Sequence, residues 1–114
     1  MVYVIVAAFI ILDVITGLIK AFKEKSFNST IMKTGAYHKA GEVCIILLGV
    51  LVDFAQQFLD LGVTVPVAAA FCVMIVLMEI GSIIENVCAI NPELLPEKFK
   101  AYFQKLSDNK GDEN

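Results

Sequence analysis

The sequence predicts an all-α, integral membrane protein with three transmembrane helices, a C-terminal amphipathic interfacial helix and an oligomeric assembly. Three observations lead to this class. Apolar residues make up 58% of the 114 residues, above the share that is usual in soluble domains. Three windows have the length and composition of membrane-spanning helices. All basic residues fall in two segments that a three-span chain places on the same side of the membrane.

The expected spans cover about residues 2–20, 41–61 and 64–86, and they form one membrane domain over residues 1–90. Each window comes close to the roughly 20 mostly apolar residues that a membrane-spanning helix needs. No cationic segment precedes the first window, so we interpret it as a retained span and not as a cleaved signal. Asp60 to Thr64 form a short polar break before the third span, and Pro66 suits the first turn of a helix.

Two further segments are expected at the cytoplasmic surface. In the first connection, Asn28 or Ser29 can cap a short helix that begins near Thr30. Residues 91–107 are expected to form an amphipathic interfacial helix, and residues 108–114 a disordered tail. The apolar face of that helix consists of Leu95, Phe99, Tyr102, Phe103 and Leu106.

The distribution of lysines predicts the orientation. The chain has nine basic residues, all of them lysines, although its net charge is -3. They lie in or beside the first connection and in the tail, so the positive-inside rule places the N-terminus outside and the C-terminus in the cytoplasm. We therefore expect a multi-pass protein of the bacterial cytoplasmic membrane that binds the lipid bilayer through cytoplasmic lysines. This lipid-facing set is Lys23, Lys25, Lys39, Lys98, Lys100 and Lys105.

Each expected span carries polar residues along one face. At about 100° per residue, these positions form a narrow stripe on an otherwise apolar helix. We interpret the stripes as pore-lining or oligomer-packing surfaces, because polar side chains in a membrane face other helices or water. Glycines in the same stripes would allow helices to approach closely. The set comprises Asp13, Gly17, Lys20, Glu42, Gly49, Asp53, Gln56, Glu79, Ser82, Glu85 and Asn86.

The acids within the stripes differ in what they predict. Asp13, Asp53 and Glu79 lie well inside their spans, where an ionised carboxylate costs about 2.5–3.5 kcal/mol on insertion scales. With Lys20 as the only cation expected inside a span, some acids would be protonated, or the stripes would line an aqueous space between subunits. Glu42 and Glu85 fit equally well as helix ends that dip into headgroups. We interpret His38 as an ordinary interfacial side chain.

Several function classes lack any pattern in the sequence. No Ser/His/Asp order, metal-ligand spacing or glycine-rich phosphate loop is present, so no enzyme, catalytic residue, cofactor or metal site is expected. Nucleic-acid binding has no support. Cys44, Cys72 and Cys88 lack the spacing of a metal or redox site, and we interpret them as small buried apolar residues.

The order of these signals resembles a known family, the small three-span holins of phage lysis cassettes and clostridial toxin-export loci. The matching pieces span most of the chain. They are LDVITGLIKA (Leu12 to Ala21), SFNST (Ser26 to Thr30), Gly35 with Lys39, Asp53, and EIGSIIENV (Glu79 to Val87) followed by Pro92 or Pro96. The stretch CAINPELLP differs from the pattern, since it lacks the glycine expected before the proline.

The resemblance implies a homo-oligomer that forms pores or lesions in the bacterial cytoplasmic membrane. These lesions would release a cell-wall hydrolase or a large toxin without direct contact with it. Two other functions remain compatible with the residues. Aligned acids also suit a small ion channel or transporter subunit, although the chain shows no internal repeat or broken helix. A membrane anchor or assembly protein whose tail recruits a partner is the other alternative.

Overall fold

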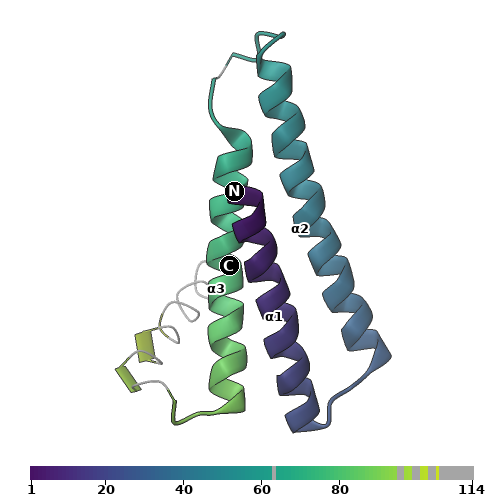
Figure 1. Ribbon diagram of the computed structural model, residues 1–114, viewed down its shortest axis with the longest axis vertical. Coiled ribbons are helices and arrows are strands. Elements are labelled where there is room, and N and C mark those ends of the chain that lie inside the picture. Colours follow the sequence, from purple (N-terminus) through teal and green to yellow (C-terminus); the bar gives the residue numbers. More distant parts are fainter. Residues whose placement is uncertain (63, 95–96, 99–100, 103–104, 106–114) are drawn as a thin grey trace.

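The chain folds into three long α-helices, α1 (Val2–Glu24), α2 (Ser29–Gln56) and α3 (Val67–Ile90) (Figure 1). This computed structural model describes residues 1–62, 64–94, 97–98, 101–102 and 105, and the described residues contain no β-strand. The expected all-α class is thereby confirmed. Helices α1 and α3 run in the same direction and α2 runs in the opposite direction. Helix α3 makes the principal contacts with both other helices.

Helix α1 ends in a left-handed turn that reverses the chain. Ser26 N–H donates to the Ala21 carbonyl (2.9 Å), and Lys25 N–H donates to the Phe22 carbonyl (3.3 Å). This pair of bonds is the Schellman motif, which satisfies carbonyls that the helix end leaves without donors. Lys25 occupies the left-handed position with φ 55°, where glycine is the more common residue.

Helix α2 is longer than the sequence indicated. Asn28 is its N-cap, as expected, and the Asn28 side chain accepts a hydrogen bond from Thr30 N–H at 2.8 Å. The helix then continues without a break through Gly35 and Gly41, so the expected short surface helix and the expected second span belong to one 28-residue helix. It ends at Gln56, before the expected end of that span at residue 61.

The connection from α2 to α3 is held by side chains of α2. Gln56 Oε1 accepts a hydrogen bond from Val65 N–H and Gln56 Nε2 donates to the Val65 carbonyl, both at 3.0 Å. Asp53 accepts from Val67 N–H at 2.8 Å and from Ala68 N–H at 3.1 Å. These bonds satisfy donors at the start of α3, where a carboxylate also complements the helix dipole. Pro66 directly precedes the first residue of α3.

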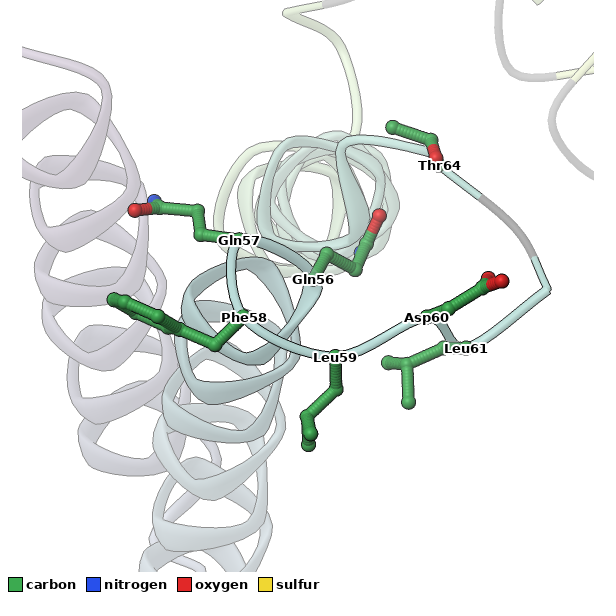
Figure 2. Close-up of a pocket in the computed structure, with 7 residues that line it drawn as sticks. All are labelled: Gln56, Gln57, Phe58, Leu59, Asp60, Leu61 and Thr64. Carbon is green, nitrogen blue, oxygen red and sulfur yellow. The ribbon is translucent and has the colours of Figure 1, made fainter.

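A shallow pocket lies over this connection, at the end of the bundle (Figure 2). The side chains of Gln56, Phe58 and Asp60 point in different directions around it and do not converge on one point. Asp60 Oδ1 accepts from Gly62 N–H at 2.9 Å, which fixes the turn. Gly62 has φ 81°, a conformation that favours glycine. We therefore interpret this pocket as a feature of the turn. It is lined by Gln56, Gln57, Phe58, Leu59, Asp60, Leu61 and Thr64.

Part of the expected C-terminal segments lies within the described residues. The described residues 97–98, 101–102 and 105 are helical. Lys98, Tyr102 and Lys105 are exposed. Lys100, the disordered tail expected at 108–114 and most of the expected apolar face lie outside the described residues; the apolar residues concerned are Leu95, Phe99, Phe103 and Leu106.

The apolar core is small, and most large apolar side chains face outward. Val6, Cys72 and Ile75 form the buried cluster, with Ile10 and Ile45 packed against it. By contrast, exposed large apolar residues occur along all three helices; examples are Ile11, Ile15, Leu18, Leu47, Leu51, Phe54, Val73 and Leu77. Such a surface is unusual for a monomeric soluble protein and suits contact with lipid.

Helices α2 and α3 are closely packed at Gly49. A Cβ atom at this position would lie 2.8 Å from Ala68 Cα and 3.0 Å from Phe71 Cδ2. Because the nearer of these atoms belongs to backbone, only movement of a helix could relieve the clash. Gly41 lies on the same helix in open space, and a Cβ atom added there would meet no atom within 4 Å.

We expect Gly49→Ala to destabilise the bundle by about 1–3 kcal/mol, the usual effect of overpacking. Gly41→Ala is the matched control, because it adds the same methyl group to the same helix in open space and gains about 1 kcal/mol of helix propensity. Thermal unfolding in detergent, followed by circular dichroism, measures both. Equal midpoints for the two variants would contradict the close packing at Gly49.

Candidate functional site: a buried ionic cluster

The three helices meet at an ionic cluster inside the bundle. Lys39 Nζ lies 2.5 Å from Asp13 Oδ2 and 2.6 Å from Glu79 Oε2. The same nitrogen lies 3.6 Å from Glu42 Oε1. One ammonium group thus joins α1, α2 and α3. We call these four residues, Lys39, Asp13, Glu42 and Glu79, the Lys39 cluster.

The cluster lies far from both ends of α1 and α3. Asp13 is the central residue of the 23-residue α1, and Glu79 lies at the middle of the 24-residue α3. All three carboxylic side chains are strongly buried, with Glu79 1% exposed, Glu42 6% and Asp13 9%. At this depth a lone charge is costly, whereas oppositely charged groups with good hydrogen bonds compensate one another.

A second layer of polar groups completes the contacts of Asp13. Asn86 Nδ2 donates to Asp13 Oδ1 and to Thr16 Oγ1, both at 3.1 Å. Thr16 Oγ1 in turn lies 2.9 Å from the Leu12 carbonyl oxygen of its own helix. Both oxygens of Asp13 are therefore satisfied, one by Lys39 and the other by Asn86. Thr16 and Asn86 are also buried, so this layer binds α1 to α3.

Glu42 is the least satisfied member of the cluster. Its Oε1 atom lies 2.9 Å from His38 Nδ1, one helical turn earlier. Both carboxylate oxygens of Glu42 are buried, and neither makes a hydrogen bond with the described residues. Lys39 Nζ lies within 4 Å of Glu79 as well as of Glu42. Two acidic groups therefore lie close to a single lysine.

An open cleft of about 430 Å³ leads from the surface to the cluster. His38 borders it from α2, and Ser82 and Glu85 border it from α3. The imidazole of His38 is 57% exposed, and Glu85 is exposed as well. No group of three or more potential metal ligands in the part of the chain that the structure describes is arranged to hold a metal ion.

The structure brings some of the expected stripe residues together and separates others. Asp13, Glu42, Glu79 and Asn86 meet at the cluster, and Ser82 lies beside Asp13. Gly17 packs near Asn86, where a Cβ atom would lie 3.6 Å from Nδ2. The others lie elsewhere: Gly49 where α2 packs against α3, Asp53 at the start of α3, Gln56 at the connection before it, Lys20 half-buried near the end of α1, and Glu85 exposed at the rim of the cleft.

Two lysines of the expected lipid-facing set make contacts within the bundle. Lys39 is the centre of the ionic cluster. Lys23 Nζ donates to the carbonyls of Ala89 (2.9 Å) and Ile90 (2.8 Å), at the C-terminus of α3, where a cation complements the helix dipole. Lys25 is exposed at the turn after α1. Sequence reasoning missed the role of Lys39 because it placed this residue in a surface connection and not within a helix.

Helices α1 and α3 are long and apolar enough to cross a membrane. Helix α2 carries Lys39, Glu42 and Asp53 and is the most polar of the three helices. With buried polar groups and an apolar exterior, the described residues have the arrangement of a membrane protein.

Comparison with known proteins identifies a family. Neither the curated proteins nor the solved structures contain one that matches the chain. The family model of the bacteriophage holin family matches residues 1–108. That range includes α1, α2 and α3 completely, and with them every residue of the Lys39 cluster. The chain, a membrane protein with polar groups buried between its helices, therefore belongs to the bacteriophage holin family.

Proposed function

We propose that this protein assembles into homo-oligomers in the bacterial cytoplasmic membrane and forms lesions through which a cell-wall hydrolase or a large toxin leaves the cytoplasm. Family membership supports a holin-type, non-enzymatic function in general terms. The observation that carries the finer proposal is the Lys39 cluster. It buries the charges of three helices inside a single chain whose exterior is apolar.

In this proposal the described bundle is the silent state. The polar faces are paired within one chain, so the protein can accumulate in lipid without admitting water. Collapse of the membrane potential or a critical density of protein then separates the helices. The polar faces exchange their internal partners for water in a multimeric lumen, where charged groups regain solvation. The apolar faces stay in contact with lipid throughout.

In this proposal α2 crosses the membrane as well, in addition to α1 and α3. At 1.5 Å per residue, its 28 residues extend about 42 Å, more than the roughly 30 Å of hydrocarbon in a bilayer. Its Lys39 side chain lies level with the middles of α1 and α3, because it contacts Asp13 and Glu79 there. The charges of this helix are compensated inside the bundle, which lowers the cost of placing them at that depth.

Lysis of bacteria tests the proposal directly. We expect controlled expression together with a cytoplasmic cell-wall hydrolase to cause abrupt lysis after a delay, and expression without the hydrolase to leave the optical density intact. Optical density and membrane potential against time are the measurements. Depolarisation without release of the hydrolase would instead indicate a small ion channel, and no effect at verified membrane expression would indicate an anchor protein.

Removal of the central cation should shorten the delay. Lys39→Met keeps an unbranched side chain of nearly the same length but leaves Asp13 and Glu79 without their cation. Breaking a buried ion pair in this way destabilises a structure by about 3–5 kcal/mol. We expect earlier onset of lysis at an equal amount of protein in the membrane, measured by immunoblot and optical density.

Two further variants make this prediction specific. Lys33→Met, at an exposed position of the same helix, should lyse at the normal time. Adding Asp13→Asn and Glu79→Gln to Lys39→Met removes the charges of the two acids nearest the lost cation and should restore much of the delay. Normal timing for Lys39→Met itself, with a normal amount in the membrane, would rule out the cluster as the element that holds the silent state.

The orientation can be tested by labelling introduced cysteines. In a variant with Cys44, Cys72 and Cys88 replaced by alanine, a cysteine at Leu61 should react with a membrane-impermeant maleimide in intact spheroplasts. A cysteine at Ser26 should react only after the membrane is permeabilised, because the two connections lie at opposite ends of the bundle (Figure 1). The reverse pattern would contradict a cytoplasmic C-terminus.

A further inference from the structure

We infer that the closed bundle contains a proton-binding site formed by Glu42 and Glu79, which hold one proton between their carboxyl groups. This inference deepens the proposed function. Only the predicted effect of pH on opening rests on that function. The site itself follows from the charges, burial and contacts of the closed bundle.

The first argument is the number of charges. Three carboxyl groups, those of Asp13, Glu42 and Glu79, lie within 4 Å of Lys39 Nζ. His38 is the second basic group, 2.9 Å from Glu42. Even with Lys39 and His38 both positively charged, three ionised carboxylates would leave one negative charge without compensation. A buried charge without a partner is strongly unfavourable, and a carboxyl group in this situation takes up a proton.

The second argument identifies the place of the proton. Both oxygens of Asp13 accept hydrogen bonds, one from Lys39 and one from Asn86. Glu42 is only 6% exposed, and neither of its carboxylate oxygens accepts a hydrogen bond from the described residues. Its acidic neighbour Glu79 is 1% exposed. Two ionised carboxylates have no hydrogen to share, whereas one added proton turns their contact into a hydrogen bond.

The third argument concerns other ligands. No group of three or more potential metal ligands is arranged to hold a metal ion in the residues that the structure describes. Lys39 already occupies the position between Asp13 and Glu79 that a cation would take. A proton is the positive charge that needs no space beyond the two carboxyl groups, and the cleft lined by His38 and Glu85 gives it a route from the surface.

The site links the state of the bundle to pH. In a lumen filled with water, Glu42 and Glu79 would separate and ionise, so the closed state binds one proton more than the open state. A rise in pH therefore favours opening, and a fall in pH favours the closed bundle. The groups that face the pair are Asp13 from α1, His38 and Lys39 from α2, and the exposed Glu85 at the rim on α3.

Infrared spectroscopy of the full-length protein in dodecyl maltoside micelles tests the site. This detergent has no ester group, so a carbonyl-stretching band of protonated carboxylic acid at neutral pH comes from the protein. We expect such a band in the wild type and its loss in Glu42→Gln, whose amide can donate to Glu79 in place of the proton. Glu85→Gln is the matched control and should keep the band.

Isotope labelling decides the residue type without any substitution. Labelling glutamate carboxyl groups with ¹³C should shift the band, because the proton lies on glutamate and not on Asp13. Absence of the band at neutral pH, its persistence in Glu42→Gln with unchanged helix content, or no shift on labelling would each overturn the site.

A separate measurement distinguishes failure of the proton site from failure of the proposed function. Release of an entrapped protein-sized dextran from phosphatidylethanolamine and phosphatidylglycerol vesicles should become faster as pH rises for the wild type, and this dependence should be lost in Glu42→Gln. No release at any pH, with the infrared band present, would contradict lesion formation and leave the proton site intact. Release with equal pH dependence in both proteins would contradict the coupling of the site to opening.

Discussion

The Lys39 ammonium group holds the bundle together through its contacts with Asp13 and Glu79. These contacts join the middles of α1 and α3 to α2 and set the register of α2 against its two neighbours. In apolar surroundings each charged group alone would be strongly unfavourable. The interaction is favourable because the lysine and the two carboxylates neutralise one another's charge. The arrangement is thus stable only while the helices remain together, and anything that separates them leaves charges that need water.

The contacts outside the cluster are of a different kind. Val6, Cys72 and Ile75 form a small apolar core, and Gly49 allows α2 to approach the backbone of α3. Lipid is as apolar as these side chains, so their packing adds little of the hydrophobic driving force that stabilises soluble proteins. A bundle held mainly by one polar centre, with an apolar exterior, can exchange neighbours without exposing new apolar surface to water. This property suits a protein that changes from single chains to an assembly.

Some residues that the sequence analysis interpreted as pore-lining or lipid-facing instead hold the ends of helices. Asp53 bonds the first residues of α3, Gln56 bonds Val65 in the connection before it, and Lys23 bonds the last carbonyls of α3. These contacts satisfy backbone groups that would otherwise lack partners at the helix ends. A polar residue in a membrane helix therefore has at least three distinct roles in this one chain: compensation of buried charge, helix capping, and contact with the cleft. Capping occurs at the helix ends, whereas the other two roles belong to the place where the three helices meet.

The class of the protein could be predicted from its amino acids alone. Composition and the length of the apolar windows indicated helices in a membrane, the order of short motifs indicated the holin family, and Asn28 marked the start of α2. Periodicity also placed Asp13, Glu42, Glu79 and Asn86 on polar faces, because a helical repeat is a local property of the chain.

The partners of those polar faces are determined by the tertiary structure, because they lie on other helices. Lys39 lies among other lysines in the sequence, and no local pattern distinguishes a lysine that neutralises buried acids from one that binds lipid headgroups. That distinction depends on the register between α2 and its neighbours. The register is set by contacts of Lys39 with Asp13, which lies 26 positions earlier in the chain, and with Glu79, which lies 40 positions later.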